Sequence, residues 1–208
     1  MTKSMCITYF VEDSLYVNIT NRCSNRCDFC IRNNGDGAYG SESLWLLREP
    51  TSDEVLDSIF SRDLTAIKEL VFCGYGEPSY RLYDARKIAL AVKERYPELR
   101  IRINTNGQSD LILGCSTAHL YEGAFDTVSI SLNSPHPDEY DRICHSKYGV
   151  LAFSSILSFA SEVKKYVPDT RFSVVSEFIS SEDILECRRI ADELGVTLRV
   201  RDYIPPAP

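Results

Sequence analysis

The sequence predicts an α/β fold, a partial (β/α)6 barrel with six mostly parallel strands and an open side. Short runs of alternating apolar and polar residues are separated by longer stretches with helical spacing, and this order repeats along the chain. Helical crossovers between consecutive strands imply a parallel sheet. The chain has 208 residues, and about 200 residues is the lower limit for a closed eight-stranded barrel. Six repeats at this length therefore favour a barrel that does not close.

The alternating runs locate the strands, and the stretches between them locate the helices. We expect strands over residues 15–20, 70–74, 100–104, 127–133, 172–178 and 197–203. We expect helices over residues 51–62, 83–96, 110–119, 151–166 and 181–194. Thr51 and Glu54 stand in capping-box positions at the start of the first helix, and Gly195 ends the last one.

The two faces of the predicted strands differ in polarity. The apolar residues that should face the helices are Ile101, Ile103, Val128, Ile130, Leu132, Leu198 and Val200. The polar residues that should face the other side are Asn18, Thr20, Arg102, Asn104, Ser129, Ser131, Asn133, Glu177, Arg199 and Arg201. Burying such groups without partners costs about 1–3 kcal/mol each, so we predict a hydrated cavity that holds a polar ligand, with Glu177 and Arg201 as cavity candidates. The alternative is a flat, doubly wound sheet whose polar residues pair with one another.

Composition excludes several classes of protein. Hydrophobic residues make up 44% of the chain and charged residues 25%, which are ordinary values for a globular protein and exclude a mainly disordered chain. The net charge of −7 argues against duplex DNA and an anionic membrane as partners. No apolar run reaches the roughly 18 residues of a membrane span, and no signal-peptide pattern follows Met1. We therefore expect a cytoplasmic protein with one domain over residues 1–208.

Three of the eight cysteines lie close together in a loop that follows the first predicted strand. Three residues separate Cys23 from Cys27, and two separate Cys27 from Cys30. Three thiolates on one short loop suit three irons of a four-iron cluster, whose usual ligand set has four cysteines. The fourth iron would then stay open, as a catalytic metal requires.

Two alternatives remain for this loop. A structural zinc site would borrow a fourth ligand such as Cys6 or Cys73, and a redox pair would use Cys27 and Cys30. The first alternative predicts a zinc-binding structural or interaction module. A cluster that serves only as an electron carrier is a further possibility. These functions differ from an enzyme in leaving the polar strand faces without a role.

The cysteine loop resembles the signature of the radical S-adenosylmethionine (SAM) superfamily. That signature has three cysteines at this spacing with an aromatic residue before the third, which Phe29 matches. The resemblance implies a [4Fe–4S] cluster on Cys23, Cys27 and Cys30, in a cluster loop over residues 20–40. It also implies an enzyme that reductively cleaves SAM to a 5′-deoxyadenosyl radical for hydrogen abstraction, with an external one-electron donor.

Three strand ends extend the resemblance to a SAM site. Gly74–Tyr75–Gly76–Glu77–Pro78 resembles the Gly-Gly-Glu-Pro motif of the family, in which backbone and a carboxylate hold the amino group of SAM. Tyr75 stands where the first glycine is usual. The Asn-Thr-Asn-Gly turn after residue 103 and the Ser-Leu-Asn end of the next strand also match family positions. The implied SAM site comprises Phe29, Gly74, Tyr75, Gly76, Glu77, Asn104, Asn106, Ser131, Asn133 and Arg142.

Within the superfamily, the chain resembles most the TatD-family-associated radical SAM proteins. The matching segments are residues 18–23, 31–37, 44–46, 49–51 and 72–78. This resemblance supplies no substrate, and the nuclease chemistry of TatD is not carried over. No second cysteine cluster follows the predicted barrel, so no auxiliary cluster domain is expected. The open side would admit a protein loop, an RNA or a small molecule, as in a glycyl-radical-type activating enzyme or an enzyme that modifies a base or a cofactor.

Overall fold

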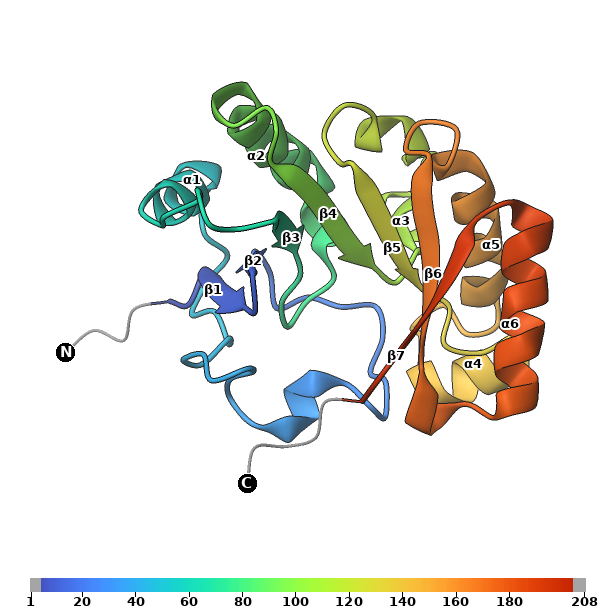
Figure 1. Cartoon of the computed structure of the whole chain (residues 1–208). Helices are drawn as coiled ribbons and strands as arrows, with labels where there is room; N and C mark the ends of the chain where they lie inside the picture. Colours follow the sequence, from blue (N-terminus) through green and yellow to red (C-terminus); the bar gives the residue numbers. More distant parts are fainter. Residues whose placement is uncertain (1–4, 204–208) are drawn as a thin grey trace.

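The computed structural model describes residues 5–203 and contains a curved, seven-stranded sheet (Figure 1). The strands follow one another in the sheet in the same order as in the chain. They are β1 (Thr8–Val11), β2 (Ser14–Val17), β3 (Glu69–Phe72), β4 (Arg100–Thr105), β5 (Thr127–Ser131), β6 (Asp169–Val175) and β7 (Thr197–Arg201). From β2 to β7 all neighbouring strands are parallel. The partial barrel expected from the sequence is thereby confirmed, with β1 and β7 as its two edges.

The strand β1 was not predicted. It pairs antiparallel with β2 through a tight hairpin in which Val11 is opposite Ser14. The turn contains Glu12 in the left-handed region, at φ 52°. A turn with glycine or asparagine is the usual sequence signal for such a hairpin, and Glu12 and Asp13 do not supply it. The six predicted parallel strands correspond to β2–β7.

Six α-helices and four short 3-10 helices connect the strands within residues 5–203. The α-helices are α1 (Ser52–Phe60), α2 (Leu82–Arg95), α3 (Ser109–Leu113), α4 (Pro137–Cys144), α5 (Leu151–Val163) and α6 (Ser181–Leu194). The 3-10 helices are η1 (Ile31–Asn34), η2 (Pro78–Arg81), η3 (Ala118–Tyr121) and η4 (Ser176–Phe178). The capping box of Thr51 and Glu54 is formed, and Gly195 ends α6 at φ 63°. Gly114 divides the helix expected over residues 110–119 into α3 and η3.

Two predictions about individual elements were wrong. The helix α4 was missed because its three core residues, Tyr140, Ile143 and Cys144, stand among charged residues in only eight positions. The strand expected over residues 172–178 ends at Val175, and the chain turns into η4. Glu177 therefore lies beyond the strand, and its direction does not follow from strand alternation.

The helices lie along the outer face of the sheet, where the main core sits (Figure 1). Ile101, Ile103, Val128 and Ile130 are fully buried there, as predicted. At the edge strand β7 the cover is thinner, and Val200 stays 38% exposed. The polar strand face lies on the opposite, concave side.

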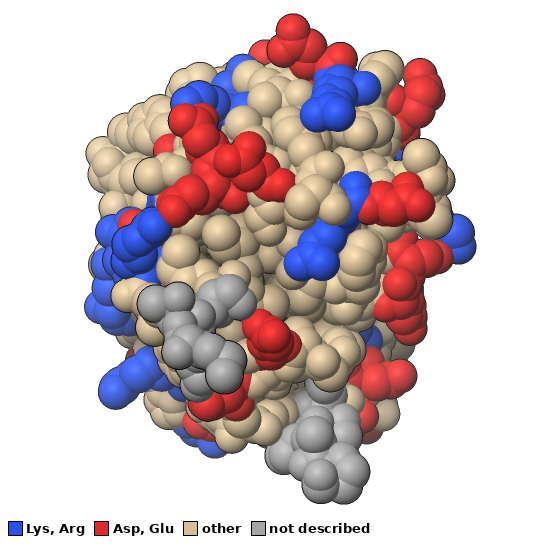
Figure 2. Space-filling model, turned by 90° about the vertical axis from the view of Figure 1, so that its left-hand side faces the viewer, with Lys and Arg blue, Asp and Glu red and all other residues tan. Residues whose placement is uncertain are grey.

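A second, smaller core lies under the cluster loop. It consists of Tyr9, Ala38, Leu44 and Tyr75, and it holds the glycine-rich segment against β1 and β3. No helix within residues 5–203 has the length and apolar composition that a membrane span requires. On the face shown in Figure 2, acidic and basic side chains are interspersed rather than merged into one basic surface.

Candidate functional site

The cluster loop lies along the end of α4. On either side of Cys27, the backbone N–H groups of Arg26 and Asp28 donate to the carbonyl oxygens of Cys144 (2.9 Å) and Ile143 (3.0 Å). These two hydrogen bonds place Cys27 opposite Cys144, and the two thiols are in side-chain contact. Residues more than a hundred positions apart in the sequence thus fix the middle of the loop.

The guanidinium group of Arg32 contacts one of the three thiols and lies within electrostatic range of the other two. Arg32 in η1 donates from Nε to Sγ of Cys30 at 3.3 Å, and its charge also acts on Cys23 and Cys27. The backbone N–H of Asn25 donates to Sγ of Cys23 at 3.4 Å. The structure therefore brings all three predicted cysteines to one place. Arg32 was not predicted, although its position two residues after Cys30 is visible in the sequence.

The pKa values of Cys23 and Cys27 are raised. Burial, and to a smaller extent the charge of Glu77, raises the pKa of Cys23 to about 12. The hydrogen bond with Cys144, followed by burial, raises the pKa of Cys27 well above its usual range. A metal centre must displace these protons, so its assembly will be favoured at higher pH.

The donor set of the loop can be compared with the needs of a cluster and of a single zinc ion. Within residues 5–203, no three side chains of Cys, His, Asp or Glu converge as ligands of one ion. Cys6 and Cys73, the expected fourth zinc ligands, lie beside Tyr9 instead. In a four-iron cluster each thiolate binds a different iron, so the sulfurs need not converge on one point. The donor set therefore fits the cluster.

Glu77 is a buried carboxylate that joins three segments. It is 4% exposed, and it accepts hydrogen bonds from Ser79 N (3.0 Å), Thr105 Oγ1 (2.8 Å) and Asn106 N (2.7 Å), as well as from the Ser79 hydroxyl. Its own N–H donates to the carbonyl of Arg22 at the start of the cluster loop (2.8 Å). Burial raises its pKa, and these hydrogen bonds oppose the rise. No ion pair with Glu77 is formed within the described residues.

The two glycines around Tyr75 are required by close packing. A Cβ atom at Gly74 would lie 2.1 Å from Oδ1 of Asn18, and one at Gly76 would lie 2.2 Å from the carbonyl oxygen of Thr20. Real side chains do not tolerate such distances, so the end of β3 approaches the end of β2 only because both residues are glycine.

Tyr75 stands where the family motif has a glycine. The larger residue fits because its side chain points away from the strand ends. Its ring packs edge-on against Trp45 at 5.0 Å between centroids, and its hydroxyl donates to the carbonyl oxygen of Gly35 at 2.8 Å. The tyrosine therefore supports the segment after the cysteines. The prediction that it lines the cofactor site is not favoured by this orientation.

A buried polar network ties the cluster loop to β4 and α4. Gln108 donates from Nε2 to Asn25 Oδ1 and to the Tyr140 hydroxyl, both at 2.9 Å, and Asn106 donates to Ser24 Oγ at 2.8 Å. All these side chains are buried. Asn106 is predicted from the sequence, whereas Gln108 and Tyr140 are not, because no local pattern marks partners 83 and 32 residues apart.

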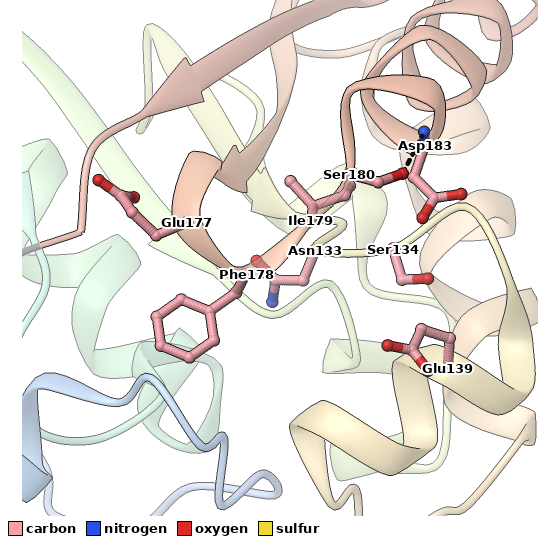
Figure 3. A pocket seen from close by; sticks show the side chains of 8 residues that line it. All are labelled: Asn133, Ser134, Glu139, Glu177, Phe178, Ile179, Ser180 and Asp183. Atoms are coloured by element: carbon pink, nitrogen blue, oxygen red, sulfur yellow. Dashed lines mark hydrogen bonds between the residues drawn. The ribbon is translucent and has the colours of Figure 1, made fainter.

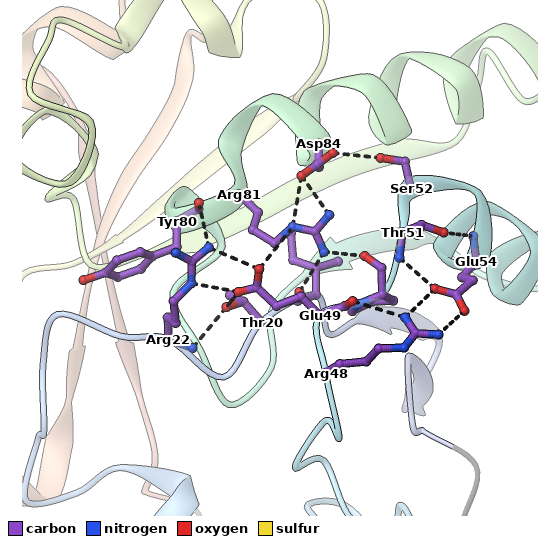
Figure 4. A network of polar contacts seen from close by, with 12 residues as sticks. Thr20, Arg22, Arg48, Glu49, Thr51, Ser52, Glu54, Tyr80, Arg81 and Asp84 are labelled. Carbon is purple, nitrogen blue, oxygen red and sulfur yellow. Dashed lines mark hydrogen bonds and ion pairs between the residues drawn. The ribbon is translucent and has the colours of Figure 1, made fainter.

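A second network anchors the start of the loop (Figure 4). Glu49 accepts from Thr20 Oγ1 at 2.6 Å and from Arg22 Nε at 2.8 Å. Arg81, whose side chain is 10% exposed, pairs with Asp84 at 2.7 Å. An ion pair at an exposed site contributes little alone, but this group joins β2, the loop before α1 and η2.

A cavity of about 310 Å³ lies at the ends of β5 and β6 (Figure 3). Asn133, predicted as a cofactor residue, lines it, is 4% exposed and adopts φ 60°. Its Nδ2 donates to Sγ of Cys144 at 3.4 Å, whereas its Oδ1 has no partner within the described chain. The cavity is lined by Asn133, Ser134, Glu139, Glu177, Phe178, Ile179, Ser180 and Asp183. A buried acceptor without a donor points to a ligand that carries one.

Phe29 connects the cluster loop to this cavity. Its ring packs against Phe178 at 5.1 Å between centroids. Glu177 accepts from the N–H of Tyr203 at 2.8 Å. The Ser176 hydroxyl, and to a smaller extent the charge of Arg201, lowers the pKa of Glu177. The two cavity candidates, Glu177 and Arg201, therefore lie near each other.

The remaining predicted residues are placed differently. Asn104 accepts from Arg102 at 2.8 Å, and Arg102 pairs with Glu69 at 2.8 Å, so this part of the concave face is internally paired. Ser131 lies in register with a residue of β6 on the same face. Arg142 is not brought to the site: it forms two hydrogen bonds with Glu139 on the exposed side of α4. The role expected for Arg142 is therefore not supported by its position.

Comparison with known proteins gives one matching family model. The model described as "Radical SAM superfamily" matches residues 17–196. Among curated proteins, the chain is similar to the GTP 3′,8-cyclase of Clostridium perfringens (strain 13 / Type A), with 26% identity over 93% of this chain and 56% of that protein. It is also similar to the GTP 3′,8-cyclase of Aquifex aeolicus (strain VF5), with 24% identity over 91% of this chain and 56% of that protein. The chain thus spans about half the length of these relatives.

Solved structures share the fold. Streptococcus suis SuiB bound to its precursor peptide SuiA superposes with a TM-score of 0.69 and 17% identity, over 92% of this chain and 39% of that chain. A radical SAM methyltransferase from Sphaerobacter thermophilus gives a TM-score of 0.68 and 16% identity, over 97% and 60%. At these identities the likeness establishes the architecture alone.

Proposed function

The chain belongs to the radical SAM superfamily, whose enzymes use a [4Fe–4S] cluster and SAM, and we propose that its cluster loop and strand ends hold these two cofactors. When bound, the reduced cluster supplies the electron that cleaves SAM to methionine and a 5′-deoxyadenosyl radical, which abstracts a hydrogen atom from the substrate. The observation that carries the proposal is the gathering of the thiols of Cys23, Cys27 and Cys30 around Arg32.

The three cysteines would ligate three irons and leave the fourth open to SAM. The loop that carries them is held within the protein by backbone hydrogen bonds to α4 and by the buried network around Gln108. A loop held in this way would bind a cluster at a lower entropic cost.

Glu77 would receive the amino group of SAM. Its Oε1 already accepts three hydrogen bonds, but its Oε2 accepts only that of Asn106 N and retains capacity for another donor. A buried carboxylate without a cation is costly, and an ammonium group would compensate it. Gly74 and Gly76 would let the backbone approach the same group.

Asn133 would bind the nucleoside part of SAM. Its free Oδ1 lines the 310 Å³ cavity, and ribose hydroxyls or the adenine amino group supply the missing donor. Phe178 offers an apolar wall on the same cavity. Ser131 is the last residue of β5 and precedes Asn133 by two positions, so it would lie near the same ligand.

The motifs support a proposal for the subgroup within the superfamily. We place it with the TatD-family-associated radical SAM proteins, as one core domain over residues 1–208 that uses an external one-electron donor. Two substrate classes compete: the cyclase relatives favour a nucleotide or another small molecule for base or cofactor modification, whereas the peptide-bound neighbour favours a protein substrate, as for a glycyl-radical-type activating enzyme. A cytoplasmic location suits its free thiols.

The decisive experiment is reconstitution with iron and sulfide without oxygen. After reduction, we expect an EPR signal that changes when SAM is added, together with 5′-deoxyadenosine. Cys27→Ala should abolish both the cluster and the nucleoside, whereas Cys115→Ala, at an exposed position, should retain them. Bound zinc without a cluster, or a cluster that ignores SAM, would contradict the proposal.

A further inference from the structure

Two arginines of the edge strand β7 point to the concave side of the sheet. Arg199 is in register with Ser173 of β6, and Arg201 is in register with Val175. Phe172 and Val174, the β6 residues that alternate with Ser173 and Val175, are fully buried on the outer face. Because cross-strand partners share a face and neighbouring residues alternate, Arg199 and Arg201 lie on the concave face.

These two arginines differ from the other arginines of that face. Arg102 pairs with Glu69 at 2.8 Å, and Arg171 pairs with Asp169 at 2.6 Å. Neither Arg199 nor Arg201 forms a hydrogen bond or an ion pair with any residue in the 5–203 range. Positions i and i+2 of a strand lie about 7 Å apart, so two like charges stand close together. The nearby carboxylate of Glu177 feels the charge of Arg201 but forms no ion pair with it within the described residues.

Their position borders the proposed cofactor site. Ser131, Ser173 and Arg199 form one row across β5, β6 and β7, and at about 4.8 Å per strand Arg199 lies about 10 Å from Ser131. The charge of Arg201 acts on Glu177, which lines the cavity of Figure 3, and on Tyr39 and Cys73. A group bound by the two arginines would therefore lie beside SAM without occupying its site.

We propose that Arg199 and Arg201 bind an anionic oxyacid group of the substrate, a phosphate or a carboxylate. This inference rests on the proposed function, since it treats the concave face as the place where the substrate meets SAM. Planar guanidinium groups bind both oxyanions through paired hydrogen bonds. Within residues 5–203 no further strand pairs with β7, so its edge gives the rest of the substrate access to the concave face.

The site is tested with inorganic phosphate on the reconstituted, SAM-loaded protein. Phosphate binding is followed by line broadening in ³¹P NMR, and succinate is then added as a carboxylate competitor. We expect saturable binding that Arg199→Gln and Arg201→Gln each weaken about tenfold, the loss expected for a hydrogen bond between charged groups. Arg188→Gln, an exposed change on α6, should bind phosphate like the parent protein. The stronger of the two ligands indicates whether the substrate carries phosphate or carboxylate.

Three results would overturn the inference. They are the absence of saturable phosphate and succinate binding, equal binding by both β7 variants and the parent, or a loss of SAM affinity in those variants, which would assign the arginines to the carboxylate of SAM. The SAM-dependent change in the EPR signal is recorded on the same proteins. If that change is absent in the parent protein, the proposed function fails, independently of whether phosphate binds.

Discussion

The two sides of the concave face differ in how completely their polar groups are paired. On the side of β2–β4, the cluster loop, Glu77 and Gln108 are held by buried hydrogen bonds to fixed partners. On the side of β5–β7, Asn133 keeps a free acceptor, and Arg199 and Arg201 have no partner within residues 5–203. In the proposed function, the first side would hold the cluster and the amino group of SAM. The second side would bind the nucleoside part of SAM through Asn133 and leave the two arginines for the substrate.

Gly76 packs against backbone atoms on the paired side, so its replacement should have the largest effect. In Gly76→Ala, the new Cβ would lie 2.2 Å from the carbonyl oxygen of Thr20, and backbone atoms cannot yield as a flexible side chain does. We expect the free energy of unfolding to fall by about 1–3 kcal/mol, with loss of SAM binding. Thermal denaturation and SAM titration measure these effects.

Gly123→Ala is the comparison for that change. Nothing lies within 4 Å of a Cβ at Gly123, which adopts φ 70°, so only backbone strain of about 1–2 kcal/mol applies. SAM binding should be unaffected. Equal SAM affinity in Gly76→Ala and the parent protein would show that the close approach of β2 and β3 is not needed for the cofactor.

Replacing Gln108 in the buried network should have the next largest effect on the paired side. Gln108→Leu leaves Asn25 Oδ1 and part of the Tyr140 hydroxyl without a partner, and each unsatisfied buried group costs about 1–3 kcal/mol. We expect lower stability in urea and faster release of iron to a chelator, because the loop that carries Cys23 and Cys27 is less firmly held.

A double-mutant cycle with Tyr140→Phe distinguishes coupling within this network from independent losses of stability. Both changes remove the hydrogen bond between Gln108 and Tyr140 at 2.9 Å, so their effects should be less than additive. Strict additivity would mean that the two side chains act independently. The cluster loop would then depend on its backbone hydrogen bonds to α4.

Glu77 gives a smaller effect that depends on pH. Burial raises its pKa above the ordinary value of 4.5, so ionisation opposes folding, and its contribution to stability is lost as the pH rises through the raised pKa. SAM binding should show the opposite slope, since the ammonium group requires the ionised carboxylate. Denaturation and SAM titration of the reconstituted protein, across the acidic to neutral range, should give slopes of opposite sign. Parallel slopes would remove Glu77 from the SAM site.

The repeating parts of the fold and the local parts of the site are predictable from the sequence. Alternation located β2–β7, and spacing located the cysteines, because both signals lie within a few residues. The hairpin strand β1 lacks a usual turn residue, and Gln108 meets Asn25 from 83 positions away. No local pattern records such partners, since they exist only after the sheet has formed.

For Arg142, the family resemblance and the structure make different predictions. Its replacement should have the smallest effect on SAM affinity. Its match to the family predicts a contact with the SAM carboxylate, whereas the structure pairs it with Glu139 at 2.5 Å on the exposed side of α4, with 67% of its side chain exposed. An exposed pair of this kind contributes about 0–1 kcal/mol, so Arg142→Ala should change SAM affinity less than twofold. A tenfold loss, measured by SAM titration, would mean that the arginine leaves Glu139 when SAM binds. The β5–β7 side would then rearrange around the cofactor rather than keep its charges free for the substrate.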